Sequence, residues 1–240
     1  MTALRAQQAA ANNASWCNAV CAAHAGPGRV DAGLWWHEGP VPRFYPNAVT
    51  LQMQPPRLMP RLQTMIDNRH GAGWSLKDSF ACLDLGSLQC RELFSAQWLW
   101  RASTPGPSEP RAGLSWRRLR SVDDLAAWER AWSADVPAPE RVFLPSLLDD
   151  AATFVIAVER GDNIVGGIIV HGAAGVAGVT NLFTCGEDEH ATRGACLAAA
   201  SACFPAAPLV TYEVDADVPL FTRLGFEPVG RLRVWLHDSA

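Results

Sequence analysis

The sequence lacks the basic stretches that binding to a nucleic-acid backbone requires. Lysine is nearly absent, since Lys77 stands alone beside nineteen arginines, and the formal net charge is −4. Residues 1–113 carry ten basic and seven acidic side chains, whereas residues 114–240 carry ten basic and seventeen acidic ones. Neither half offers the positive surface that phosphate groups need. We therefore expect no nucleic-acid partner.

The sequence also lacks the signs of a secreted, disulfide-linked protein. Its seven cysteines are an odd number, and no basic segment followed by an apolar one opens the sequence. We expect a cytoplasmic protein. Cys17, Cys21 and His24 are spaced to share one helical face, as metal ligands can, but no further ligands follow at a diagnostic spacing. Buried cysteines of a core explain this spacing equally well, so we predict no metal site.

Two catalytic motifs and a convincing membrane span are absent. The sequence contains no Gly-x-Ser-x-Gly elbow and no Walker-type loop, which argues against α/β-hydrolase and P-loop folds. The uncharged residues 163–186 have the length of a membrane span, but Gly172, Gly175 and Gly178 interrupt them and acidic residues flank them. Two buried strands joined by a glycine-rich turn fit better. We expect no membrane partner.

A proline-rich break lies near the middle of the sequence. Residues 102–113 hold three prolines, which exclude both a helix and a central strand. The net charge also changes sign across this segment. We therefore predict one domain at residues 1–101, a linker at 102–113 and a second domain at 114–240.

The second half alternates apolar runs with helical patterns. Helices are expected at residues 122–132, about 190–203 and 218–224. Strands are expected at residues 114–119, 153–158, 164–171, 176–184, 209–214 and 229–236. The three strands between residues 153 and 184 leave no room for helical crossovers, so they must be antiparallel, whereas each of the last two helices connects strands that can lie parallel. The prediction is an α/β (α+β) fold with a mixed sheet.

The first half gives a weaker pattern. We expect a helix from its cap at Ser15 to His24, and a second helix at residues 57–67. Strand candidates are residues 34–37, 48–52, 74–85 and 93–100. Seven tryptophans lie within the first 116 residues, two of them adjacent at Trp35 and Trp36. These rings can form the floor of a ligand pocket, although core filling is the more common role of tryptophan.

Residues 220–230, Leu-Phe-Thr-Arg-Leu-Gly-Phe-Glu-Pro-Val-Gly, resemble the late signature of the GNAT superfamily of acyl-CoA-dependent N-acetyltransferases. In that family a short helix ends in Leu-Gly-Phe and leads into the final strands. Residues 163–168, Asn-Ile-Val-Gly-Gly-Ile, are similar to the family's middle strands. The resemblance covers about residues 114–236 and includes the order of helices and strands. The first half looks faintly like a partial second copy, which implies two GNAT-like units in tandem.

The resemblance implies that acetyl-CoA is the acyl donor and lies between the strands at 176–184 and 209–214. The main-chain amides that would hold its pantetheine arm and polarise its thioester belong to Leu182, Phe183 and Thr184. The groups that would meet its diphosphate, at the start of the next helix, belong to Arg193, Gly194 and Ala195.

Two features depart from the family's pattern. Ala191 and Cys196 replace the Gln/Arg and the last glycine of the family's diphosphate loop, and three acidic residues at 187–189 precede the helix. Negative charge at that point disfavours a diphosphate. Phe221, which we place at the cofactor, stands where many family members have a tyrosine that protonates the departing thiolate.

Three residues are candidates for proton transfer. Tyr212 is the nearest replacement for the missing hydroxyl, and Glu159 and Glu213 are candidate bases for an amine, although each also fits a structural role at a strand. We expect an N-acetyltransferase that acts on a small-molecule or peptide amine of unknown identity. The alternative is a catalytically degenerate GNAT-fold module that binds another ligand or a protein. The sequence leaves the oligomeric state open, with a dimer as one option.

Overall fold

The computed structural model describes residues 1–31, 33–53, 55–68, 73–103, 113–134, 140–186 and 188–238, without the side chains of residues 55–57. The chain divides into two compact units, of which the first comprises residues 1–99 and 212–240 and the second residues 100–211. Most of the expected linker, residues 104–112, lies outside the described residues. The domain boundaries at 101 and 114 stay a prediction, and the compact units follow a different division because the C-terminal segment groups with the N-terminal one.

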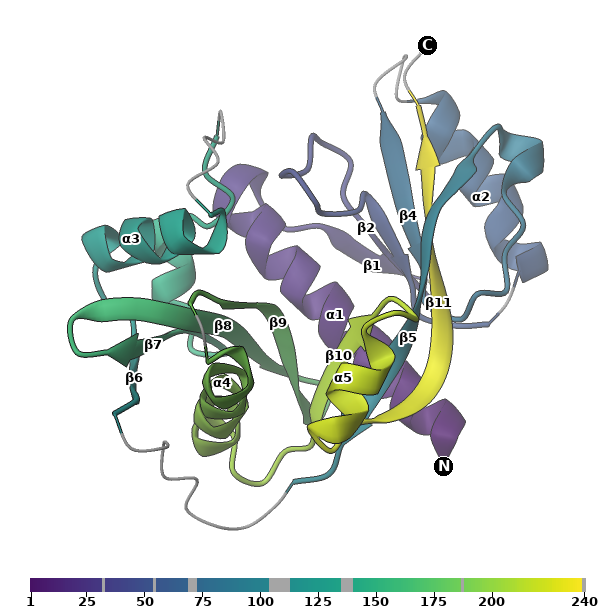
Figure 1. The fold of residues 1–240 in the computed structure, drawn as a ribbon. Helices are drawn as coiled ribbons and strands as arrows, with labels where there is room; N and C mark the ends of the chain where they lie inside the picture. Colours follow the sequence, from purple (N-terminus) through teal and green to yellow (C-terminus); the bar gives the residue numbers. More distant parts are fainter. Residues whose placement is uncertain are drawn as a thin grey trace. The chain divides into compact units, whose positions relative to one another are not determined.

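The first unit contains helices on a mixed sheet (Figure 1). Its helices are α1 (Thr2–Ala25), α2 (Pro55–Asp67) and α5 (Val218–Arg223). Its strands are β1 (Arg29–Asp31), β2 (Leu34–Trp36), β3 (Ala48–Thr50), β4 (Trp74–Asp78), most of β5 (Arg91–Arg101) and β11 (Glu227–His237). The strand order is β1-β2-β3-β4-β11-β5. Helix α2 connects β3 to β4, and these two strands are parallel.

The predicted N-terminal helix was too short. Helix α1 begins at Thr2, so Ser15 lies within the helix and does not cap it. The residues before Ser15 are rich in alanine, the strongest helix former, and this explains why the helix starts earlier. The helix ends at Gly26, whose φ of 100° lies in the region that favours glycine.

The strand predicted at residues 74–85 stops early, because the chain turns at Asp78. This side chain is fully buried, and its carboxylate accepts hydrogen bonds from the backbone N–H groups of Phe80 (3.3 Å) and Leu83 (2.8 Å). Burial raises the pKa of Asp78, and the hydrogen bonds from the backbone oppose that rise. The carboxylate therefore holds the turn that ends β4.

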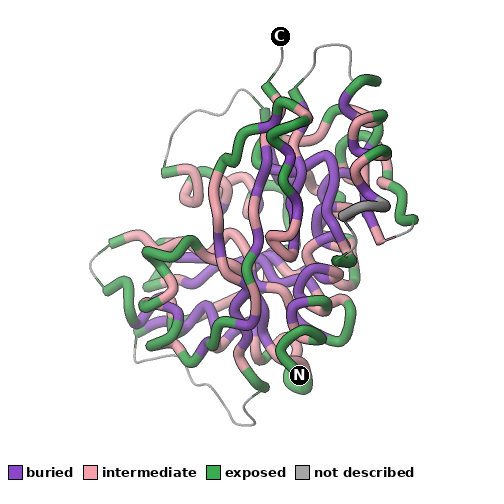
Figure 2. The backbone as a smooth tube through the Cα atoms, turned by 90° about the vertical axis from the view of Figure 1, so that its right-hand side faces the viewer, coloured by how far each residue is buried: buried purple, intermediate pink, exposed green. Residues whose placement is uncertain are grey.

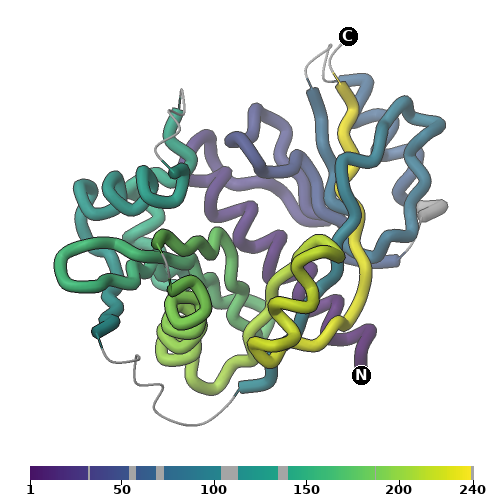
Figure 3. The backbone as a smooth tube through the Cα atoms, viewed as in Figure 1, coloured from purple at the N-terminus to yellow at the C-terminus, as the bar shows by residue number. Residues whose placement is uncertain are grey.

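The predicted last strand lies in the first unit as β11. It pairs antiparallel with β4, with Arg233 opposite Asp78 and His237 opposite Trp74, and its other neighbour is β5. Figure 3 shows β11, in yellow, running beside these two strands. The helix at 218–224 thus leads into a strand that lies between β4 and β5.

The second unit has the element order predicted from the sequence. Its helices are α3 (Val122–Trp132) and α4 (Glu189–Cys203), and its 3-10 turn is η2 (Pro145–Leu148). Its strands are β6 (Ser115–Arg118), β7 (Thr153–Arg160), β8 (Asn163–Ala173), β9 (Val176–Thr184) and the start of β10 (Leu209–Glu213). The order is β10-β9-β8-β7-β6, with β6 to β9 antiparallel and β9 parallel to β10. The mixed sheet is confirmed.

The uncharged residues 163–186 form β8 and β9, as expected. Within the part of the chain that the structure describes, no helix combines the length and the apolar character that crossing a bilayer would demand. Both strands contribute buried residues to the interior of the second unit, and Figure 2 marks such buried stretches of backbone in purple.

Two adjacent glycines on β8 set how closely the helices approach the sheet. A Cβ atom on Gly166 would lie 2.4 Å from Thr192 Cγ2 of α4, and one on Gly167 would lie 2.1 Å from Trp128 Nε1 of α3. Successive residues of a strand face opposite sides of the sheet, so α3 and α4 cover opposite faces. The buried indole of Trp128 donates a hydrogen bond to the Ile156 carbonyl at 2.8 Å.

Candidate functional site

The candidate acyl-donor site is built on an irregularity of strand β9. In the register with β8, Phe183 lies opposite Gly167 but Thr180 lies opposite Ile169, so β9 has one residue more than β8 in this interval. Asn181 lies in the interval with a positive φ of 52°. Such a bulge turns backbone groups of the longer strand out of the ladder. Asn181 and Leu182 have no Cα partner on β8 in this register.

The opposite edge of β9 is paired over a short distance. Strand β10 is parallel to β9, and the described register between them contains only the pairs Leu209 with Ala177 and Val210 with Gly178. Strand β9 continues to Thr184 beyond these pairs, and the bulge lies in that continuation. Helix α4 follows β9 and packs on β8 and β9. Backbone amides of β9 can therefore meet a ligand at this edge.

The start of α4 already carries negative groups of its own. Asp188 is the N-cap, and its carboxylate accepts a hydrogen bond from Ala191 N at 3.3 Å. Arg160 lies 3.9 Å from the Asp188 carboxylate, and Arg193 lies 2.7 Å from that of Glu189. Residue 187 lies outside the described residues. An anionic ligand would compete with these carboxylates for the amides and the arginines.

The predicted pantetheine-binding residues lie at or next to the bulge. Leu182 is in it, and Phe183 and Thr184 follow it, opposite Gly167 and Gly166. The Phe183 ring packs edge-to-face on Trp128, with centroids 5.2 Å apart. Packing between the sheet and α3 thus holds the strand directly after the bulge.

The predicted diphosphate-binding residues lie beyond the first turn of α4. Because the helix begins at Glu189, its free amides come before Arg193, Gly194 and Ala195. Gly194 is exposed, and a Cβ atom there would have no atom within 4 Å apart from its chain neighbours and the backbone of its own helix, whereas Ala195 is buried. These residues can therefore offer a ligand the side chain of Arg193 and the open surface at Gly194. Their role in binding the diphosphate stays a prediction.

Glu159 is engaged in an ion pair. Arg117 Nε donates to the Glu159 carboxylate at 2.9 Å, and Arg117 Nη2 donates to that of Asp124 at the same distance. The bond to Asp124 is the main reason why the pKa of Arg117 is raised, and it lowers the pKa of Asp124. Strand β8 separates the strand of Glu159 from β9. The ion pair with Arg117 favours a structural role for Glu159, and the role of Glu159 as a base stays a prediction.

Tyr212, Glu213 and Phe221 belong to the first unit. The Tyr212 ring packs edge-to-face on Trp98, with centroids 5.4 Å apart. Glu213 is half-buried at the end of β10. Phe221 is buried against Phe226, with ring centroids 5.6 Å apart. None of their predicted roles is tested by these contacts.

Sequence reasoning gave no role to Lys77, which the structure places beside Tyr212. The Lys77 ammonium lies 4.1 Å from the centroid of the Tyr212 ring and donates a hydrogen bond to Asn13 Oδ1 at 2.8 Å. Only 4% of this residue is exposed. Buried lysines are rare. In the sequence, only the fact that Lys77 is the single lysine of the chain could have drawn attention to it.

The three residues considered for a metal do not share one environment. Cys17 and Cys21 are buried in α1, whereas His24 is exposed. Burial raises the pKa of Cys17 to about 11 and that of Cys21 to about 12, so both are held as thiols. Over the described ranges, no group of three histidine, cysteine or acidic side chains is placed to hold a metal ion.

Solved structures resemble this chain although its sequence has no close match. No protein-family model matches the sequence, and no curated protein is significantly similar to it. A GCN5-related N-acetyltransferase from Kribbella flavida is 15% identical, with a TM-score of 0.65 over 96% of each chain. A putative acetyltransferase of the GNAT family from Novosphingobium aromaticivorans is 14% identical, with a TM-score of 0.57 over 89% of this chain and 91% of its own.

A third similar structure is a tandem GNAT protein from the clavulanic acid biosynthesis pathway, in a form without acetyl-CoA. It is 11% identical, with a TM-score of 0.53 over 81% of this chain and 74% of its own. At these identities the likeness concerns the fold. The chain has the GNAT fold, which confirms the resemblance drawn from residues 114–236.

Proposed function

We propose, from the GNAT fold of this chain, that it is an N-acetyltransferase that passes the acetyl group of acetyl-CoA to an amine. The observation that carries the proposal is the bulge at Asn181 and Leu182, at the edge of β9 where pairing with β10 has ended. Such an edge supplies the main-chain donors that a pantetheine arm and a developing thioester oxyanion require. Acetyl-CoA, when bound, would supply an acetyl group activated as a thioester.

The residues around β9 and α4 fit one part of acetyl-CoA better than the other. The bulged strand suits the amide-rich arm, because backbone donors and acceptors alternate along it. The helix start suits the diphosphate less well, because Asp188 already accepts a hydrogen bond from Ala191 N. Arg193 is the cation that can turn from Glu189 towards a phosphate group.

Acyl transfer to an amine needs a base that takes a proton and an acid that protonates the thiolate. We propose Tyr212 as the acid and Glu213 as the base, with Glu159 second because of its ion pair with Arg117. The acceptor is a small-molecule or peptide amine. All seven cysteines are free, as in a reducing compartment, so we propose that the reaction takes place in the cytoplasm.

A second candidate function is a GNAT-fold module that binds another ligand without catalysis. Two observations favour it. Asp188 and Glu189 place carboxylates where a diphosphate would lie, and buried Phe221 offers no hydroxyl for proton transfer. Binding and turnover must therefore be measured separately.

Calorimetric titration of the full chain with acetyl-CoA tests binding, and a matched pair of variants tests the site. Gly194→Glu and Gly194→Gln add side chains of nearly equal size at an exposed position with open space around it. Only glutamate adds a negative charge near the diphosphate, so we expect a loss of affinity of about tenfold or more for Gly194→Glu and little change for Gly194→Gln. Neither variant should lower the melting temperature, because both residues favour helix over glycine.

The outcomes separate the two functions. Release of CoA in the presence of one of a panel of amines, followed with a thiol reagent, would support the enzyme. Binding of acetyl-CoA without release of CoA in any assay would contradict the enzyme, and absence of acetyl-CoA binding would support the module that binds another ligand. Absence of binding at millimolar acetyl-CoA would contradict the proposal that acetyl-CoA is the acyl donor and that it binds at β9 and α4. Equal affinities of the two Gly194 variants for acetyl-CoA would contradict the proposed position of the diphosphate.

A further inference from the structure

The single lysine of the chain lies buried beside Tyr212, the residue proposed above as the acid. Lys77 is on β4, and its ammonium lies 4.1 Å from the centroid of the Tyr212 ring. The ammonium also donates a hydrogen bond to Asn13 Oδ1 of α1 at 2.8 Å. All three residues belong to the first unit, so these contacts lie within one compact part of the chain.

The charge of Lys77 has no countercharge beside it. Among the residues that the structure describes, no carboxylate forms an ion pair with its ammonium, and its one hydrogen-bond partner is the neutral amide of Asn13. The carboxylate of Asp78, the next residue, is used by the turn that ends β4. Burial raises the pKa of Cys17 to about 11 although the charge of Lys77 opposes this rise, so this thiol stays uncharged. A buried ammonium in these surroundings stabilises a negative charge that forms nearby, with little screening by water.

The ring of Tyr212 is held in place, whereas its hydroxyl is not engaged. The Trp98 ring packs edge-to-face on the Tyr212 ring, and the Trp98 indole donates a hydrogen bond to the Ser79 carbonyl at 2.8 Å. The Lys77 ammonium lies over the same Tyr212 ring. Tyr212 is half-buried, and its hydroxyl has no hydrogen-bond partner in the described part of the chain. A phenol held in this way can give its proton to a ligand.

We propose that Lys77 is a positioning residue for proton donation by Tyr212, an inference that rests on the function proposed above. The O–H bond of Tyr212 breaks as its proton passes to the departing thiolate, where an S–H bond forms. The Tyr212 oxygen then carries a negative charge, which the ammonium of Lys77 stabilises. The phenolate regains a proton from solvent, and the proton that the base takes from the amine passes to solvent.

Single-turnover release of CoA by the full chain tests the effect on acetyl transfer. Lys77→Met should lower the rate constant about tenfold, because the charge that stabilises the phenolate is lost, and should leave the affinity for acetyl-CoA unchanged. Lys77→Arg keeps a cation and should restore most of the rate. In a chain that already carries Tyr212→Phe, Lys77→Met should have no further effect, because its influence passes through the Tyr212 hydroxyl.

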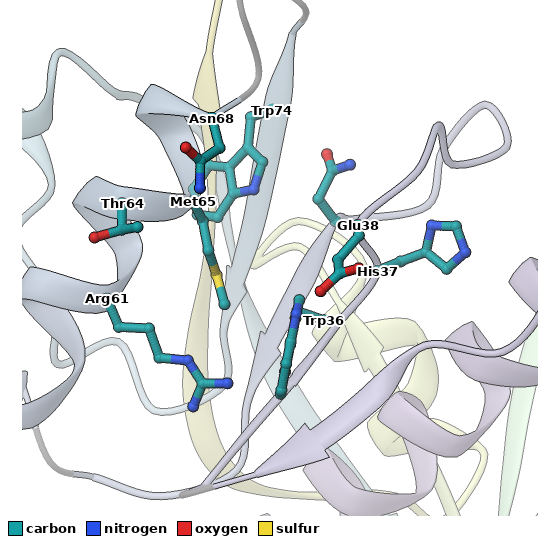
Figure 4. Close-up of a pocket in the computed structure, with 9 residues that line it drawn as sticks. Trp36, His37, Glu38, Arg61, Thr64, Met65, Asn68 and Trp74 are labelled. Carbon is teal, nitrogen blue, oxygen red and sulfur yellow. The ribbon is translucent and has the colours of Figure 1, made fainter.

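The matched control is Arg61→Met, which removes another cation from an aromatic ring of the same unit. Figure 4 shows Arg61 of α2 reaching towards Trp36 at a mostly polar cavity of about 500 Å³. The Arg61 guanidinium also lies 4.1 Å from the centroid of its ring partner. Neither Lys77 nor Tyr212 belongs to the lining of that cavity. Arg61→Met should therefore leave the single-turnover rate unchanged.

The tyrosines give a second readout, which needs no acetyl-CoA. The chain has two tyrosines, so ¹³C NMR spectra of the labelled rings separate Tyr212 from Tyr45. Tyr212 should ionise at a higher pH in Lys77→Met than in Lys77→Arg, because only arginine keeps a positive charge beside the phenolate. The difference should be smaller for Tyr45, which packs on Trp16.

The outcomes distinguish the role of Lys77 from the proposed function. Equal rates of the wild-type chain and Lys77→Met, or an equal loss of rate with and without Tyr212→Phe, would overturn the role of Lys77 and leave acetyl transfer standing. No release of CoA by the wild-type chain with any amine would overturn the proposed function. Equal ionisation of Tyr212 in the two Lys77 variants would overturn the role of Lys77 in either case. If Lys77→Met fails to fold, Lys77→Gln removes the charge and keeps a donor for Asn13.

Discussion

At the scale of single residues, buried His171 on β8 makes the stability of the second unit depend on pH. Its Nδ1 lies 2.9 Å from Thr153 Oγ1, and the Thr153 hydroxyl donates its proton to Asp150 at 2.6 Å. Thr153 Oγ1 therefore accepts a hydrogen bond from Nδ1–H of His171. Burial lowers the pKa of His171, and the nearby Asp150 carboxylate opposes this effect.

The lowered pKa predicts a loss of stability in mild acid. An unfolded histidine titrates near about 6.5, so below that pH the unfolded chain binds a proton that folded His171 does not. The contribution of His171 to the free energy of unfolding should therefore be constant above this value and fall below it, by at most about 1.4 kcal/mol per pH unit, until the folded pKa is reached. Urea unfolding at pH 7.5 and 5.5 measures the difference. This difference in the free energy of unfolding should be smaller in the His171→Gln variant. An unchanged difference would show that His171 does not cause the loss of stability in acid.

At the scale of elements, the Gly166–Gly167 pair determines how α3 and α4 pack on β8. Gly167→Ala would place a Cβ atom 2.1 Å from Trp128 Nε1 and 2.9 Å from the Ile156 carbonyl. Helix α3 would have to shift, and the hydrogen bond between these two residues would break. We expect a loss of about 3 kcal/mol or more in the free energy of unfolding.

The control for this prediction is Gly194→Ala on α4. That glycine is exposed, and the methyl group of an alanine there would meet no atom within 4 Å apart from its chain neighbours and the backbone of its own helix. Alanine should therefore stabilise the helix by up to about 1 kcal/mol. Urea unfolding of both variants gives the comparison. If Gly167→Ala were no more destabilising than Gly194→Ala, the close approach of α3 would not be required for folding.

Elements with local signals could be predicted from the sequence. Helix α3 has the predicted bounds, because its apolar spacing is regular and Ser121 caps it, accepting a hydrogen bond from Asp124 N at 3.1 Å. Strand β1 was missed because all three of its residues are exposed, so that no apolar alternation marks it.

The candidate sites contain features that no local pattern encodes. The bulge at Asn181 depends on the register of β9 against β8, and register is a property of two strands together. Sequence analysis could therefore indicate the strand of the candidate donor site, but could not predict its bulge.

At the scale of the whole chain, the C-terminal strand completes the N-terminal unit. Strand β11 lies between β4 and β5, so a chain that ends at Leu224 leaves both without their shared neighbour. We expect this truncation to unfold the first unit and to leave β7, β8 and β9 folded, because they pair with one another. Hydrogen exchange should show lost protection in α1 and β4 and retained protection in β8.

A chain that ends at Asp238 is the control for the truncation, since it keeps β11 and the ion pair between Arg91 and Asp238. It should retain the protection of both units. Protected amides in β4 of the shorter chain would show that the first unit does not need β11.

The late position of β11 in the sequence also determines the order in which the two units can fold during translation. Strands β4 and β5 are complete once residue 101 has been made, but their common neighbour starts at residue 227. At about 5–20 residues per second, translation of the segment between them takes on the order of ten seconds. Throughout that time both strands have an unpaired edge, the kind of surface on which nascent chains aggregate. The second unit, made later, is therefore ready to fold before the first can be completed.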